Sequence, residues 1–182
     1  MTHPAPRRSR ANLFAILGIA ALLVVGGVLA VVVVTSRDSE TADPAPTTTA
    51  GAADTRLAAE RDAALADGEE AVEVFNTLDH RQVEADLDRW ESVATGDLLA
   101  QMRDKREQYV AQVTNARSTS TGNVLDAGLT ELDERAGTAR LIAAVSVEVT
   151  IEGRQPTTKR TRVTADLERT DDGWKVSQIS TL

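Results

Sequence analysis

The stretch Arg140–Glu152, RLIAAVSVEVTIE, alternates apolar and polar side chains along most of its length. Its odd-numbered positions, from Leu141 through Val147 to Ile151, are all apolar. Successive side chains of a strand point to opposite faces, so this pattern predicts a β-strand with one buried and one solvated face. Burial of a single face is typical of an antiparallel sheet.

The chain that follows continues the same odd-numbered pattern. A turn at Glu152–Arg154 leads into a second predicted strand, whose apolar positions run from Val163 to Leu167. The sequence Asp171–Gly173 is typical of a hairpin turn, and a last strand follows it from Trp174. A weaker strand is predicted before all of these, from Val124 to Leu132. Together these segments predict a four-stranded antiparallel sheet.

The chain before the sheet has helical periodicity. Apolar residues recur every three or four positions from Thr55, which predicts a first helix that ends before Asp79. Asp79 and Gln82 have the spacing of a capping box, which predicts a second, short helix. Thr95 is the predicted N-cap of a third helix, which continues to Ala116.

Three helices followed by four strands predict an α+β domain over residues 55–182, with the helices packed on one sheet face. This order of elements is common among cone-shaped domains of the nuclear-transport-factor-2-like class. The inner face formed by Leu141–Ile151 against the first and third helices is either a solid core or a ligand cavity. The sequence leaves both interpretations open.

The N-terminal part contains a 22-residue apolar run, LFAILGIAALLVVGGVLAVVVV, at residues 13–34. Because about 20 helical residues cross a bilayer, this run predicts a single transmembrane helix. Three arginines lie in residues 1–12, which predicts a cytoplasmic tail and an extracytoplasmic C-terminal domain in the cell membrane. A cleaved signal peptide, ending at Val28–Ala30, is the alternative, but this run is longer than a usual signal core.

Residues 35–54 separate the predicted span from the predicted domain. They contain two prolines, three consecutive threonines and several alanines, but no large apolar side chain. Such a segment cannot bury a core of its own, so we expect a flexible tether.

The composition excludes several functional classes. The chain has 20 basic and 28 acidic residues and a formal net charge of −8, which argues against nucleic-acid binding. The absence of cysteine excludes thiol catalysis and thiolate metal sites. His80 falls in a predicted turn, where an exposed residue is expected, and Tyr109 lies on an apolar helix face. No metal-ligand spacing, phosphate loop or nucleophile elbow is present, so we expect no enzyme activity and no catalytic, cofactor or metal residues.

One basic cluster stands out in the acidic part of the chain, at Lys159, Arg160 and Arg162. These charges either protect a strand edge from unwanted pairing or dock an acidic partner. With polar residues of the predicted outer strand faces, they form the expected partner contact surface: Lys159, Arg160, Arg162, Thr150, Thr164 and Asp166.

Five short motifs carry a family resemblance that covers nearly the whole chain. They are VFNTLD at 74–79, DLDRW at 86–90, ATGDL at 94–98, STGNV at 120–124 and GWKVS at 173–177. With the basic N-terminus, single span and tether, they resemble the Mce-associated membrane proteins of mycobacteria and related actinobacteria. The resemblance implies a non-catalytic accessory protein that supports the assembly or stability of an Mce-type lipid or sterol importer, with importer subunits as partners. The alternative is a cone domain that binds a lipid or other small apolar molecule.

Overall fold

The computed structural model describes residues 47–182. The predicted cytoplasmic tail and transmembrane helix, and residues 35–46 of the predicted tether, lie outside this range. No helix within the described range is long and apolar enough to cross a membrane.

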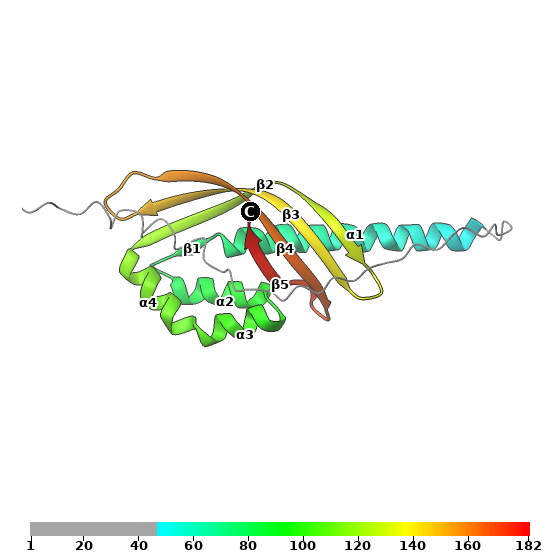
Figure 1. The fold of residues 1–182 in the computed structure, drawn as a ribbon, viewed down its shortest axis with the longest axis horizontal. Helices are drawn as coiled ribbons and strands as arrows, with labels where there is room; N and C mark the ends of the chain where they lie inside the picture. The colour runs from blue at the N-terminus through cyan, green and yellow to red at the C-terminus, as the bar shows by residue number, and fades with distance from the viewer. Residues whose placement is uncertain (1–46) are drawn as a thin grey trace, which may run out of the picture.

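Within the described residues, four helices precede the main part of the sheet, where three were predicted for the domain (Figure 1). The first begins at Thr47 rather than Thr55, so the last eight residues of the predicted tether are helical. Alanine, the best helix former, recurs at positions 50, 52 and 53, and each residue added to an existing helix gains one hydrogen bond. The helices are α1 (Thr47–Phe75), α2 (Val83–Val93), α3 (Gly96–Asp104) and α4 (Arg106–Ala116).

The predicted third helix is interrupted at Lys105, whose backbone leaves the helical region and separates α3 from α4. The two helices bury their apolar residues in different places. Met102 of α3 packs in the main core under the sheet, whereas Val113 of α4 packs in a second cluster with Val83 and Leu87 of α2. Apolar spacing reports the buried face of each helix, but it does not reveal a change of direction between them.

The sheet has five antiparallel strands in the order β1-β2-β3-β4-β5, one strand more than predicted. The additional strand has two residues and pairs with Thr119 and Ser120. The next strand begins six positions before the predicted Val124. The strands are β1 (Leu78–Asp79), β2 (Ser118–Asp133), β3 (Thr138–Ile151), β4 (Thr157–Thr170) and β5 (Gly173–Thr181).

The predicted register of the sheet is confirmed. Leu141 and Val145 on β3 are fully buried, and so is Ala165 on β4, which pairs with Leu141. Side chains that are paired across strands share one face, so these odd-numbered residues line the face that the helices cover (Figure 1). The inner face joins Val72 of α1 and Val176 of β5 in one hydrophobic core.

Of the two predicted helix caps, one is confirmed in position and one is wrong. The predicted capping box does not form, because Asp79 lies in β1 and Gln82, the residue before α2, makes no side-chain capping hydrogen bond. Thr95 is the N-cap of α3, as predicted, but its side chain makes no capping hydrogen bond either. Its backbone N–H instead donates to the Val176 carbonyl at 2.8 Å, which ties the α2–α3 connection to β5.

Candidate functional site

The six predicted contact residues do not share one face of the sheet. Arg160 pairs with Ser146 and Arg162 pairs with Ala144, so both arginines lie on the outer face, opposite the helices. Lys159 pairs with Val147, a core residue, and therefore belongs to the inner face. The basic cluster thus places charge on both sides of β4.

The outer-face members are also spread along the sheet. Thr150 lies beside Thr119 of β2, near the β3–β4 turn. It is about 20 Å along β3 from Ala144, the partner of Arg162, at about 3.3 Å per residue. Thr164 and Asp166 lie further along β4 in the other direction, so these residues form a line and not a compact patch.

Asp166 already has a partner within the sheet. Its Oδ1 accepts a hydrogen bond from Nε of Arg140 at 2.6 Å, and Nη1 of Arg140 donates to Glu131 at 3.0 Å. The hydrogen bond to Asp166 raises the pKa of Arg140. These two bonds link charged side chains of β2, β3 and β4 on the outer face near the β2–β3 turn, so Asp166 is engaged within the sheet.

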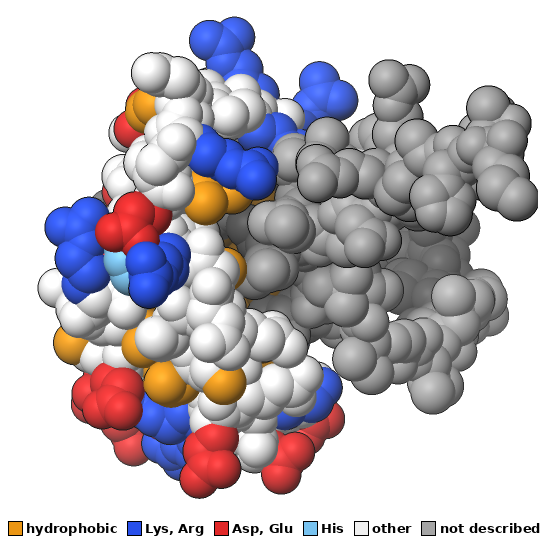
Figure 2. Space-filling view, turned by 90° about the vertical axis from the view of Figure 1, so that its left-hand side faces the viewer, with side chains coloured by type: hydrophobic (Ala, Val, Ile, Leu, Met, Phe, Trp, Pro, Cys, Tyr) orange, Lys and Arg blue, Asp and Glu red, His pale blue; other side chains and the backbone are white. Residues whose placement is uncertain are grey.

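The basic end of the sheet is different. Within residues 47–182, no ion pair involves Lys159, Arg160 or Arg162. All three side chains are exposed. Figure 2 shows basic side chains over the upper part of this end of the molecule, whereas most acidic side chains lie at its lower edge, with a few basic ones among them. This end of the sheet therefore presents basic side chains without ion-pair partners, on a protein that is acidic overall.

The turn after β1 holds the nearest approach to a catalytic arrangement. The Nδ1 atom of His80 lies 3.4 Å from Oδ1 of Asp79 and 3.5 Å from the Thr119 hydroxyl. The expectation of an exposed histidine is wrong, since only 17% of the His80 side chain is exposed. The same Asp79 oxygen accepts the backbone N–H of Arg81 at 2.9 Å, and this bond is the largest cause of the lowered pKa of Asp79.

The structural role of Asp86, which lies beneath this turn, was not predicted from the sequence. Asp86 is 1% exposed, and its carboxylate accepts the backbone N–H of Asp79 at 2.6 Å and a hydrogen bond from the Arg89 side chain. A buried carboxylate needs such partners, so Asp86 is satisfied by fixing β1 against α2. No local sequence pattern signals this role, because the partners come together only through the turn.

Tyr109 packs as predicted. Its ring makes an edge contact with Trp90, and Trp90 makes another with Phe75, with centroid distances of 6.5 and 5.9 Å. Burial raises the pKa of the Tyr109 hydroxyl. A protonated, packed tyrosine in this position is a structural residue.

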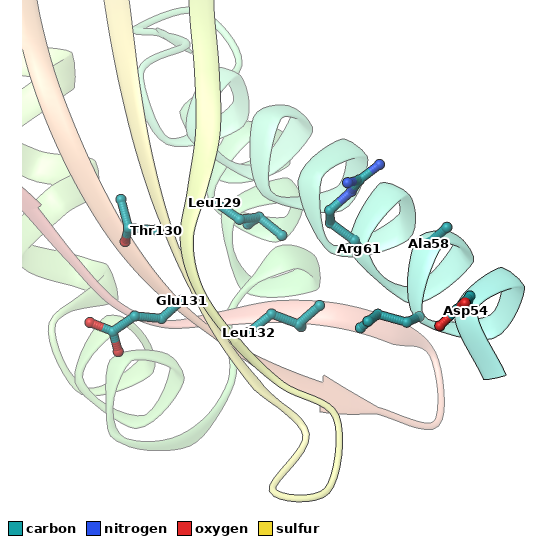
Figure 3. A pocket seen from close by; sticks show the side chains of 8 residues that line it. Asp54, Ala58, Arg61, Leu129, Thr130, Glu131 and Leu132 are labelled. Atoms are coloured by element: carbon teal, nitrogen blue, oxygen red, sulfur yellow. The ribbon is translucent and has the colours of Figure 1, made fainter. Parts of the chain in front are cut away.

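Two open grooves run between α1 and β2. The first, about 400 Å³, has an apolar floor at which Leu129 and Leu132 point toward α1 near Ala58 and Arg61 (Figure 3). The second, about 500 Å³, is lined by three glutamates of α1 and by Val124–Ala127. Both lie outside the core, and the inner sheet face itself is filled by side chains. No group of three or more potential metal ligands occurs in the part of the chain that the structure describes.

No protein-family model and no curated protein match this sequence. Solved structures do match it in fold. An IcmL-like type IV secretion system protein from Legionella pneumophila has a TM-score of 0.54 at 12% identity, covering 65% of this chain and 88% of that one. The periplasmic domain of DotI has a TM-score of 0.54 at 14% sequence identity, and the match covers 65% of this chain and 91% of that one.

CagV, a VirB8 homolog of the type IV secretion system of Helicobacter pylori, gives a TM-score of 0.52 at 11% identity, covering 66% of this chain and 96% of that one. At this level of identity the likeness is one of fold. The chain therefore contains an α+β domain, with helices on one face of an antiparallel sheet, of the kind found in these secretion-system proteins.

Proposed function

We propose that this protein is a non-catalytic, membrane-anchored accessory subunit of a transport complex in the cell envelope. Its domain lies outside the cytoplasm and acts by contact with other subunits. The observation that carries this proposal is the fold shared with a periplasmic domain and with components of type IV secretion systems.

The interior of the domain supports a role based on contact. Leu141, Val145 and Val176 are fully buried in one continuous core, which leaves the space under the sheet occupied by protein. The carboxylates of Asp79 and Asp86 are engaged in holding the backbone of the β1 turn. A cluster of unpaired positive charge is instead on the surface, at the basic end of β4.

The complex that we propose is an Mce-type importer of lipids or sterols, and this assignment rests on the resemblance of the five sequence motifs. The accessory protein would support the assembly or stability of the importer subunits. The alternative function, binding of a lipid in the domain itself, would use the apolar groove between α1 and β2, where Leu57 is 47% exposed.

The test is cross-linking of the full chain in its native membrane, followed by pull-down and identification of its partners. We expect importer subunits to co-purify, and we expect their abundance to fall in a deletion strain. Absence of importer subunits together with unchanged levels would reject the accessory role, and secretion-system subunits alone would reject the Mce assignment. A lipid that co-purifies with the full chain, without protein partners, would favour the alternative.

Two variants test whether the basic side chains of β4 form the contact with the partner. Reversing Lys159, Arg160 and Arg162 together to glutamate should weaken the association and leave the domain folded, because all three side chains are exposed and unpaired in the described range. Arg135→Glu, at an exposed position in the turn between β2 and β3, is the control and should leave the association unchanged.

A further inference from the structure

One edge of β4 has no partner over its first residues. Toward β3, β4 is paired along its length as far as Thr157. On the other side, β5 pairs with β4 from Thr170 only to Val163, and the backbone N–H of Leu182 donates to the Arg162 carbonyl at 2.9 Å. No described strand lies on that side of Thr157–Thr161.

Three hydrogen bonds identify which backbone groups face this open edge. The carbonyls of Arg162 and Asp166 accept bonds from Leu182 and Ser177 on the β5 side. The N–H of Arg169 donates to the Gly137 carbonyl on the β3 side. Backbone groups alternate along a strand, so even-numbered residues of β4 point away from β3. The N–H and C=O groups of Thr158 and Arg160 are therefore presented at the open edge.

The side chains at this edge carry positive charge on both faces of the sheet. Arg160 and Arg162 lie on the outer face and Lys159 lies on the inner face. A second copy of this edge is a poor partner, because pairing of two such edges brings like charges together. Pro156, directly before β4, also limits extension of a ladder in that direction. The edge thus disfavours self-association and attracts acidic chains.

We propose that an extended acidic segment of a partner protein adds to this edge of β4 as a further strand. Main-chain bonds to Thr158 and Arg160 supply affinity, and carboxylates opposite Lys159 and Arg160 supply specificity, with Arg162 adding positive charge beside the end of the segment. This inference rests on the proposed function, in that the partner is a subunit which the domain contacts.

The distribution of charge defines the sequence of such a segment. Leu182 and Thr181 already lie opposite Arg162 and Val163, so an added strand can pair only with Thr157–Thr161. Carboxylates are required opposite Arg160 on the outer face and opposite Lys159 on the inner face. For a segment antiparallel to β4, this order corresponds to two consecutive glutamates, the first opposite Arg160 and the second opposite Lys159. An acidic strand with carboxylates on one face only, at every second position, would leave Lys159 unpaired and should bind more weakly.

The probe is the fluorescent synthetic peptide Val-Glu-Glu-Val-Thr, whose five residues match the open stretch Thr157–Thr161, added to the purified full chain in detergent. We expect saturable binding. Thr158→Pro, which removes an edge-facing N–H, should weaken it about tenfold or more, whereas Thr158→Val keeps the N–H and should not. Reversing Arg160 and Arg162 to glutamate should weaken it about tenfold.

Peptide variants test the geometry without any change to the protein. N-methylation of the first glutamate, opposite Arg160, removes an N–H that faces β4 and should abolish binding. N-methylation of the second glutamate, opposite Lys159, modifies an N–H that points away and should have a smaller effect. Equal binding of both N-methylated peptides, or equally tight binding of single-stranded DNA of the same charge, would show that only charge is recognised and would overturn the proposal.

Amide hydrogen exchange provides the structural readout. With peptide bound, the amides of Thr158 and Arg160 should gain protection, whereas those of Lys159 and Thr161, which already face β3, should not change. The experiments can reject the proposed function and the proposed strand addition independently of each other. Peptide binding without importer association would reject the proposed function alone, and importer association without peptide binding would reject strand addition alone.

Discussion

At the scale of single residues, Gly122 of β2 allows the end of α1 to approach the sheet closely. A Cβ atom on this residue would overlap the Cβ of Asn76 and lie 3.2 Å from the Glu73 carbonyl. The Gly122 N–H donates to the Thr77 hydroxyl at 3.1 Å, so the end of α1 is held directly against this strand.

Replacement of this glycine should therefore separate α1 from β2. We expect Gly122→Ala to lower the free energy of unfolding by about 1–3 kcal/mol, because the contact is with backbone and Cβ atoms that cannot rotate away. Gly128→Ala on the same strand is the control, since no atom lies within 4 Å of the Cβ position there. Chemical denaturation would measure both, and an equal loss in the two variants would contradict the close approach.

Residue-scale features are the least predictable from the sequence. The buried Asp86 lies two positions from Asp88, which is 71% exposed, and nothing in the local pattern distinguishes the two carboxylates. The difference arises because the β1 turn brings the Asp79 N–H to Asp86. The inner-face position of Lys159, in contrast, follows from the odd-numbered rule that predicted Val147 and Val163.

At the scale of elements, the register of β3 is the strongest feature predicted from the sequence. Val147→Asp should unfold the domain, because it places an unpaired carboxylate on the buried face at a cost of several kcal/mol. Glu148→Lys, on the exposed outer face of the same strand, should be tolerated. Circular dichroism would compare the variants, and equal loss of helix and strand signal in both would refute the register.

The elements that were missed lack the signal on which the prediction depends. The first part of β2, Ser118–Asn123, has no alternating apolar side chains, and its place in the sheet comes from backbone pairing with β3. The strand β1 is too short to show any period. The break at Lys105 occurs within a continuous apolar pattern, because α3 and α4 both bury a face but against different neighbours.

The three short helices are held together by a charged network centred on Glu91 of α2. Its carboxylate accepts hydrogen bonds from Arg103 of α3 at 3.0 Å and from Arg106 of α4 at 2.7 Å. The bond from Arg103 is the largest cause of the lowered pKa of Glu91. Only 18% of the Glu91 side chain is exposed, which limits screening by solvent.

This network should make stability depend on pH. Because the pKa of Glu91 is lowered by folding, its contribution is fully present above the unfolded value, about 4.3, and is lost as pH falls through the folded value. Glu91→Gln should cost about 1 kcal/mol at pH 7, and the difference from wild type should shrink below about pH 4. Glu107→Gln, an exposed carboxylate of α4, is the control. A constant difference at every pH would contradict this role.

At the scale of the whole molecule, α1 sets the direction of the domain. A helix of 29 residues is about 43 Å long. Its first turns extend past the sheet, and the β3–β4 turn lies toward the opposite end of the described structure (Figure 1). The start of α1 is the end nearer in sequence to the predicted span. With the predicted span in the membrane, we expect the basic edge of β4 to be directed away from the bilayer, where an extracytoplasmic partner would have access to it.

The last prediction concerns the orientation on which this arrangement depends. Three arginines precede the apolar run at residues 13–34, so we expect a single span with residues 47–182 outside the cytoplasm. A C-terminal alkaline phosphatase fusion should be active and a C-terminal fluorescent-protein fusion that matures only in the cytoplasm should be dark. Replacing Arg7, Arg8 and Arg10 with glutamate should increase the fraction of inverted chains. Cytoplasmic activity of the fusions to the native sequence would overturn the orientation and, with it, access of extracytoplasmic partners to β4.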